Sequence, residues 1–350
     1  MDMTLPAELR CPVHRTAFLA VRSNANDVAE VRGACGCVFA VLKGIPRFIP
    51  DAGYADAFGI QWNAFQKTQL DSYTGVPISR DRLTRCLGGS LEDLRGASVL
   101  EVGCGAGRFT EILLGAGARV FACDLSGAVE ANLANCGGAP GYFVCQADVL
   151  SLPVTAGAFD VVMALGMIQH TPSPEATIAA LAEAVRPGGL LVLDHYRALR
   201  PPMRWLYPLT TRALLRRILL RLPPPLAFRA TGFMVRALLP VHQLLWRRGI
   251  VVDSVRAVWR HVSPVYDYYD TYPELGKGLA DWALLDTHDG LTDHYKHFRT
   301  PGEIAAALTA ARLEVLDSRP GGNGVEARAR RPSGSADSRA YASLGHGGPA

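Results

Sequence analysis

The sequence predicts an α/β fold built around a parallel sheet. Strand-like and helix-like segments alternate between residues 97 and 196, which is the pattern of successive βαβ units. A glycine-rich turn follows the first of these strands, and glycine permits the tight turn and close backbone approach that a bound ligand needs. A further helix and two strand-like segments occupy residues 302–330. We therefore expect one large α/β sheet completed by the C-terminal segments.

Length and composition are compatible with a large core. The chain has 350 residues, of which 49% are hydrophobic and 19% charged, so one large domain with additions is expected. No uncharged apolar run reaches 18 residues, which predicts no transmembrane helix. Residues 1–10 lack the basic and apolar regions of a signal peptide. We therefore expect a cytoplasmic protein whose eight cysteines are thiols or metal ligands, not disulfides.

The strongest motif is the glycine-rich turn itself. Glu101 lies at the end of the first strand, and three glycines follow it, namely Gly103, Gly105 and Gly107. A dinucleotide-binding loop would have its third glycine at position 108, which is Arg108 here. An acid at the strand end would repel a pyrophosphate but favour the amino group of S-adenosylmethionine (SAM). The motif therefore favours SAM over NAD, and a glycine turn without a ligand is the alternative.

Two more acids follow the next two strands. The strand 119–123 ends at Asp124, about twenty residues beyond the glycines, where a carboxylate can bind both ribose hydroxyls. The strand 142–145 is followed by Asp148, which can accept the adenine amino group, and by Val149, which can pack on the ring. Either acid alone would be an ordinary loop residue. Their order and spacing instead predict contact with SAM.

These segments together resemble the class I SAM-dependent methyltransferase family, and specifically its bacterial small-molecule branch. The resemblance covers residues 97–196 closely, including the Arg-Pro-Gly-Gly run at 186–189. It implies a Rossmann-like seven-stranded sheet closed by an antiparallel hairpin. The flanking runs 58–62, 68–71 and 286–289 resemble members of the branch that carry a zinc-ribbon-like segment at the N-terminus.

The resemblance also implies where further cofactor contacts lie. In relatives, helices before the first strand cover SAM, so Gln61 and Trp62 are expected to line its pocket, although Trp62 is equally compatible with a core position. Leu125 follows the ribose-binding acid, and Leu165 ends the fourth predicted strand. Both are expected beside the cofactor, because ligands collect at the carboxyl ends of parallel strands.

The predicted organisation has six parts. Residues 1–50 form an irregular zinc-ribbon-like segment, 51–96 a helical cap, 97–196 the SAM-binding core, 197–300 a helical insertion that covers the acceptor site, 301–331 the last helix and strands, and 332–350 a disordered tail. The tail is rich in small residues with little to bury.

Four N-terminal residues have the chemistry of a structural zinc site. Cys11 and His14 form one pair, and Cys35 and Cys37 form the other. Tetrahedral Cys₃His coordination is typical of structural zinc. The pairs depart from the usual two C-x-x-C knuckles, so a ribbon that has lost its metal is the alternative.

The insertion is strongly basic. Residues 197–260 contain thirteen arginines and a single acid, Asp253, and 212–222 is predicted to be a basic amphipathic helix. A lid with solvated arginines, peripheral contact with an anionic membrane, and attraction of a phosphorylated or carrier-bound substrate all stay open. Nucleic acid is disfavoured, because the span lacks lysine and has few aromatic residues for base stacking.

Candidate acceptor-site residues follow the last parallel strands and lie in the polar stretch 286–300. His170 and His195 are candidate bases, because an unperturbed histidine titrates near neutral pH, although His170 is also compatible with only shaping the pocket. Asp289 is a further candidate base. Side chains expected to contact the acceptor are Tyr196, His288, Tyr295, Lys296 and Arg299. A hydrogen-bonded segment that fixes the insertion to the core is the alternative for this stretch.

The sequence thus predicts methyl transfer from SAM to an oxygen, nitrogen or carbon atom of a small molecule, in secondary or sugar metabolism. The alternatives are methylation of an RNA base or of a lipid-linked substrate, and a non-catalytic SAM-binding partner protein. No oligomeric state is predicted.

Overall fold

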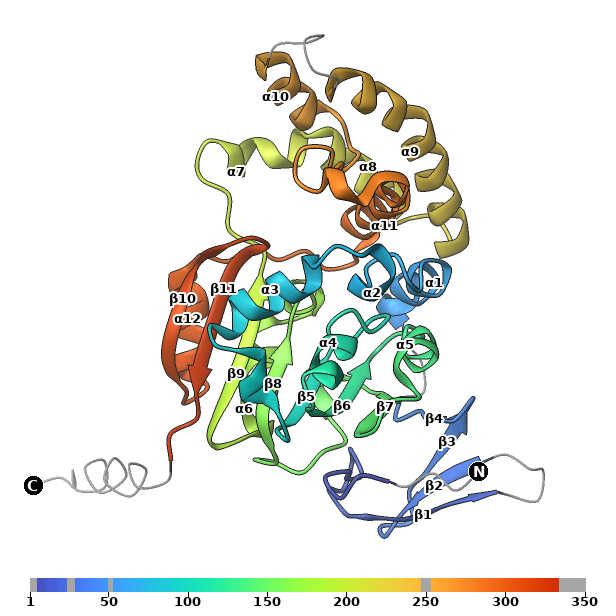
Figure 1. Cartoon of the computed structure of the whole chain (residues 1–350), viewed down its shortest axis with the longest axis vertical. Coiled ribbons are helices and arrows are strands. Elements are labelled where there is room, and N and C mark those ends of the chain that lie inside the picture. The colour runs from blue at the N-terminus through green and yellow to red at the C-terminus, as the bar shows by residue number, and fades with distance from the viewer. Residues whose placement is uncertain (1–4, 24–28, 50–52, 247–252, 334–350) are drawn as a thin grey trace, which may run out of the picture.

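The computed structural model of the chain describes residues 5–23, 29–49, 53–246 and 253–333. A central sheet with helices on both faces lies between a small N-terminal sheet and a helical layer formed by the insertion (Figure 1). Of the predicted tail, residues 334–350 lie outside the described residues.

The central sheet has seven strands in the order β10-β11-β9-β8-β5-β6-β7. Five strands are parallel to one another, and β11 is antiparallel to both β9 and β10. The strands are β5 Ser98–Val102, β6 Arg119–Asp124, β7 Tyr142–Gln146, β8 Phe159–Ala164, β9 Val185–His195, β10 Glu314–Gly321 and β11 Gly324–Arg330. This is the expected Rossmann-like class I sheet closed by an antiparallel hairpin.

Both faces of the sheet are buried, as parallel sheets require. Alternate residues of β5 enter different apolar clusters: Leu100 and Val102 pack on one face, and Val99 packs on the other. The helices α6 Pro174–Ala184 and α12 Pro301–Ala310 cover the first face, whereas α3 Ile78–Leu87, α4 Thr110–Gly115 and α5 Val129–Cys136 cover the second (Figure 1).

The N-terminal segment is a four-stranded sheet and not the irregular segment expected from the sequence. Its strands are β1 Phe18–Ser23, β2 Ala29–Gly33, β3 Val38–Leu42 and β4 Ile45–Pro46. It adjoins β7: the Phe48 N–H donates to the Gln146 carbonyl at 2.8 Å, and Arg47 forms an ion pair with Glu130 on α5 at 3.0 Å.

Short helices precede the central sheet in the chain. They are η1 Gly53–Ala55, α1 Asp56–Ala64, α2 Asp71–Thr74 and η2 Leu91–Leu94, in addition to α3. Short 3-10 turns also follow two parallel strands, namely η3 Val149–Ser151 and η4 Ile168–His170. The helix α1 contacts both α9 and α11 of the insertion, so the N-terminal helices and the insertion form one cover.

The regular elements of the described insertion are all helices, joined by short non-helical segments such as 263–272. Its elements are α7 Met203–Leu206, η5 Tyr207–Leu209, α8 Thr211–Leu219, α9 Pro224–Trp246, α10 Asp253–Val262, η6 Pro273–Gly278 and α11 Leu279–Thr292. A third apolar cluster joins α9 to α11 through Val235, Leu239 and Trp282. No described helix is both long enough and apolar enough to cross a bilayer.

The polar stretch 286–300 is only partly a loop. Its first seven residues form the C-terminal half of α11, whose inner side faces the end of the central sheet (Figure 1).

Candidate active site

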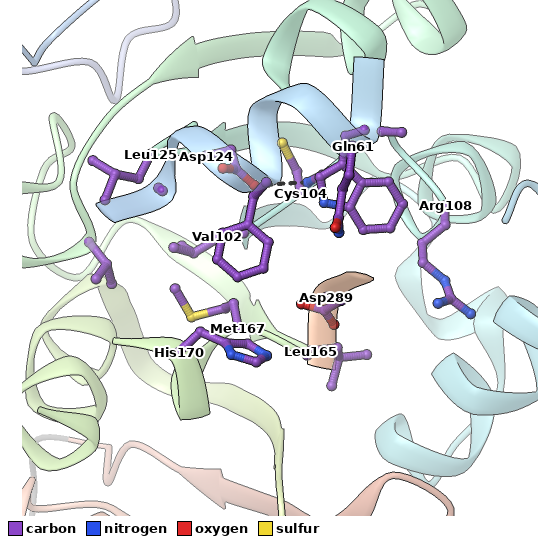
Figure 2. Close-up of a pocket in the computed structure, with 18 of the residues that line it drawn as sticks. Gln61, Val102, Cys104, Arg108, Asp124, Leu125, Leu165, Met167, His170 and Asp289 are labelled. Carbon is purple, nitrogen blue, oxygen red and sulfur yellow. Dashed lines mark hydrogen bonds between the residues drawn. The ribbon is translucent and has the colours of Figure 1, made fainter. Parts of the chain in front are cut away.

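A cavity lies at the carboxyl ends of β5, β6, β7 and β8, where ligands bind in open α/β sheets. Its empty volume is about 1020 Å³, including space open to solvent. Residues from the glycine turn, from α1 and from α11 line it (Figure 2). The predicted site residues on its wall are Gln61, Trp62, Gly103, Gly105, Asp124, Leu125, Asp148, Val149, Leu165, His170 and Asp289.

The glycine turn provides a wall that side chains would block. Gly103 has φ +74°, and a Cβ there would lie 2.6 Å from the Met167 side chain. Gly105 has φ +50°, and a Cβ there would lie 3.3 Å from the Trp62 ring. Gly107 also has positive φ but packs toward Cys136 and does not line the cavity. The turn therefore allows backbone to approach a ligand at two of its three glycines.

The two strand-end acids lie in the same cavity. Asp124 accepts hydrogen bonds from the backbone N–H of Gly105 at 3.0 Å and of Ser126 at 2.8 Å. Burial raises the pKa of Asp124, although these hydrogen bonds oppose the shift. Asp148 accepts from the backbone N–H of Leu150 at 2.9 Å. Backbone bonds thus orient both carboxyl groups.

Glu101 does not reach the cavity surface. It is 2% exposed, and Thr110 donates a hydrogen bond to its Oε2 at 2.6 Å. Burial raises the pKa of Glu101 to about 8, so this carboxyl group is largely protonated at neutral pH. Glu101 is thus not part of the cavity wall in this structure, and its contact with SAM stays a prediction.

Three polar side chains in the cavity wall have buried atoms that lack a hydrogen-bond partner among the described residues. They are Gln61 at both amide atoms, His170 at Nε2 and Asp289 at Oδ1. The three come from α1, from η4 and from α11 (Figure 2). Because an unsatisfied buried polar atom is costly, their convergence on one cavity indicates a polar ligand there.

Contacts at Nδ1, the ring nitrogen that points away from the unpartnered Nε2, hold His170 in place. The Asp293 carboxylate lies 3.3 Å from His170 Nδ1, and the Tyr295 carbonyl lies 3.4 Å from the same atom. The rings of Phe58 and Tyr196 pack against the imidazole at 5.4 and 5.3 Å between centroids. A carboxylate on one nitrogen orients the ring and favours proton uptake at the other.

Asp293 joins the insertion to this histidine. Its carboxylate also accepts from Arg216 on α8 and from Lys296, each at 2.7 Å. Burial alone would raise the pKa of Asp293, but the His170 hydrogen bond and the positive charge of Lys296 hold it below its ordinary value. Asp293 is therefore ionised near neutral pH.

Asp289 projects from α11 one helical turn before Asp293. Burial raises its pKa to about 6, and the charge on a protonated His170 would lower it. A partly buried carboxyl group with a pKa raised in this way suits proton transfer near neutral pH.

Asp286 links α11 to the N-terminal helices. Its carboxylate accepts from Gln69 and from Trp282, each at 3.1 Å, and from the Tyr268 hydroxyl. Gln69 in turn accepts from Arg108 at 2.5 Å. Burial lowers the pKa of Arg108 to about 10, and the nearby charge of Arg82 adds to the effect. This network holds α11 over the glycine turn.

Several predicted acceptor-site residues lie outside the cavity wall. They are His195, Tyr196, His288, Tyr295, Lys296 and Arg299. His195 is fully buried with Nδ1 2.9 Å from the Tyr196 carbonyl, and burial lowers its pKa. His288 packs on Phe228 of α9, and Arg299 pairs with Glu175 at 2.8 Å. The structure thus places the six residues outside the wall of this cavity, and their contact with the acceptor stays a prediction.

The N-terminal cysteines and histidine converge as predicted. One ligand atom from each of Cys11, His14, Cys35 and Cys37 lies within 4.8 Å of the others. The other five cysteines are buried free thiols of the main body. This donor set and its compactness fit a tetrahedral zinc ion.

Sequence reasoning missed several residues of the site. Arg108 and Met167 line the cavity, and Asp293 orients His170. The only available signal for Asp293 was its position four residues after Asp289, which places both acids on one helical face.

Comparison with known proteins identifies the central segment. Residues 100–193 match the methyltransferase domain family. This part of the chain is therefore similar to methyltransferase domains. It is 37% identical over 117 residues to the ubiquinone biosynthesis O-methyltransferase of Aromatoleum aromaticum, covering 32% of this chain and 47% of that protein. The enzyme of the same name from Xanthomonas oryzae is 38% identical over 107 residues, covering 29% and 44%. The chain thus spans less than half the length of these curated relatives.

Solved structures resemble the chain more distantly. An O-methyltransferase family protein from Burkholderia thailandensis has a TM-score of 0.41 at 15% identity and covers 76% of this chain and 60% of that one. A SAM-dependent methyltransferase from Aquifex aeolicus has a TM-score of 0.38 at 14% identity, covering 72% and 89%. The class I fold of the central sheet is therefore recognised from its own strand order.

Proposed function

We propose that the chain transfers a methyl group from SAM to an oxygen atom of a small-molecule acceptor bound in the cavity. One observation carries this proposal: the glycine turn, both strand-end acids and three unpartnered polar groups face the same cavity. The curated relatives named above are O-methyltransferases, which favours oxygen over nitrogen or carbon as the methylated atom.

The residues present fit SAM. The Asp124 carboxylate is suited to the ribose hydroxyls and Asp148 to the adenine amino group, with Leu125 and Val149 as apolar neighbours of the ring. The unpartnered Gln61 amide and the ring of Trp62, both from α1, also line the cavity. When bound, SAM supplies a methyl group already activated by the sulfonium charge.

His170 would take up the acceptor proton at Nε2. Its Nδ1 is held by the ionised Asp293, which stabilises the imidazolium that forms. Base catalysis of this kind contributes typically 10²- to 10⁴-fold. Asp289, whose pKa is about 6, is placed to accept a second acceptor hydrogen bond at Oδ1. The carboxylate would orient the acceptor, and α1 and α11 would exclude water from it.

We further propose that Cys11, His14, Cys35 and Cys37 hold a structural zinc ion. Four protein ligands leave no position open for substrate, so the ion would stabilise the N-terminal sheet and take no part in the reaction. That sheet lies against β7 and α5, which connects its stability to the core.

The test is methyl transfer in a cell extract. The purified chain is incubated with methyl-labelled SAM and extract, which is then separated into small-molecule, lipid and RNA fractions. Label among small molecules supports the proposal and allows the acceptor to be identified by mass. Label only in RNA or only in lipid would show that the acceptor is an RNA or a lipid and not a small soluble molecule. SAM binding without label in any fraction would indicate a non-catalytic SAM-binding protein.

A further inference from the structure

The outer surface of the insertion exposes an unusual concentration of apolar side chains. Twelve of the nineteen exposed large apolar residues in the described chain belong to residues 203–262. They are Trp205, Leu206, Leu209, Leu214, Ile218, Leu226, Phe233, Val241, Leu244, Val255, Val258 and Val262. Exposed apolar clusters on such a scale mark interaction surfaces.

The outer side of α9 alternates apolar and basic residues. Leu226, Arg229, Phe233 and Arg236 are all exposed, and their spacing of three, four and three residues places them on one helical face. Phe233 is 76% exposed. The opposite face of α9 is buried against α11, so this stripe is the side of α9 that no other described residue covers.

Two other helices of the insertion repeat the pattern. On α8, Leu214 and Ile218 are exposed one turn apart, and Arg217 is exposed beside them. Trp205 on α7 is 76% exposed and follows the exposed Arg204. These helices, with α10, form the layer of the molecule farthest from the N-terminal sheet (Figure 1).

The positive charge and the composition of this layer indicate which kind of partner it binds. Residues 197–260 carry thirteen arginines against one acid, so the same layer of a second copy would be repelled and a symmetric dimer through it is disfavoured. Ten of the twelve exposed apolar residues are aliphatic and offer no face for base stacking, which disfavours nucleic acid. Aliphatic and aromatic side chains interleaved with arginine are instead the composition of helices that lie in the interface of an anionic bilayer.

We propose that α7, α8 and α9 dock on an anionic phospholipid surface. Trp205 and Phe233 would enter the boundary between headgroups and acyl chains, and Arg229 and Arg236 would pair with lipid phosphates. The opposite side of α8 holds Asp293 through Arg216, so the docked layer would adjoin the cover of the cavity. The docking does not depend on methyl transfer and is tested separately from it.

The experiment is flotation of the purified full chain with two kinds of vesicle, phosphatidylcholine alone and phosphatidylcholine mixed with phosphatidylglycerol. The first variant combines Arg229→Gln and Arg236→Gln, and the second is Phe233→Ser. The matched controls are Arg330→Gln and Tyr73→Ser, because both residues are exposed outside the insertion. Circular dichroism of every variant establishes that it is folded.

We expect the chain to float with anionic vesicles only and to be released by salt, which screens the attraction. Each arginine near such a surface is worth about 1 kcal/mol, so the double variant should bind about thirtyfold more weakly. Phe233→Ser should also reduce binding, and the controls should not. Failure to float with anionic vesicles, equal binding by the arginine variant and wild type, or tighter binding of single-stranded RNA through the same arginines would each overturn the proposal.

Discussion

Asp289→Asn should make the protein more stable while it weakens catalysis. Burial raises the pKa of Asp289 from 3.8 to about 6, so the folded chain binds this proton more tightly than the unfolded chain does. Stability is therefore lost as pH rises from about 4 to about 6 and stays lost above that range. A shift of about two pKa units corresponds to up to about 3 kcal/mol. Asparagine has the same shape and carries no such cost.

Thermal unfolding without SAM measures this effect. With an unfolding entropy of about 2.1 cal/mol/K per residue, about 3 kcal/mol corresponds to roughly 4 °C in Tm. We expect the gain in full at pH 8 and about half of it at pH 5. Asp281→Asn is the matched control, because Asp281 is an exposed residue of the same helix and should shift stability by less than about 0.5 kcal/mol. A loss of stability in Asp289→Asn, or a gain that does not depend on pH, would refute the burial argument.

Two further predictions concern His170 and the N-terminal sheet. His170→Gln and Asp293→Asn should each lower kcat by about 10²-fold or more, measured by steady-state kinetics. The affinity for SAM, measured by calorimetry, should change little. An unchanged kcat in both variants would show that His170 does not act as a base. Cys37→Ser should lose the bound zinc and lower Tm, whereas Cys86→Ser should retain the metal, measured by metal analysis of the purified proteins. Equal zinc content in the two variants would contradict the site.

The sequence predicted the central sheet because its signals are local. An apolar run that is followed by Gly103 or that ends at Asp124 can be recognised as a strand from neighbouring residues alone. The parallel topology then brings the carboxyl ends of these strands together. The four residues of the predicted metal site could be recognised from residue type, because cysteine and histidine are typical zinc ligands. The strands of the N-terminal sheet escaped prediction, because they are short and the segment 34–37 between them is rich in glycine and cysteine.

The acceptor side was harder to predict because it depends on packing between distant segments. His195 lies at the end of a parallel strand and His170 follows the end of another, yet Arg197 after β9 pairs with Arg299 and His195 is buried outside the cavity wall. Asp293 becomes the partner of His170 only because α11 packs over the sheet, and its ion pair with Arg216 spans 77 residues. No local pattern encodes such contacts.

Titration of SAM into the purified chain by calorimetry tests the central claim most directly. Asp124 orients toward the cavity, and an arginine at position 105 would meet both a positive φ and the Trp62 ring. We predict saturable SAM binding by the wild-type chain, binding at least about tenfold weaker in Asp124→Ala, and none in Gly105→Arg, with both variants folded. Wild-type affinity in both variants would show that SAM does not occupy this cavity.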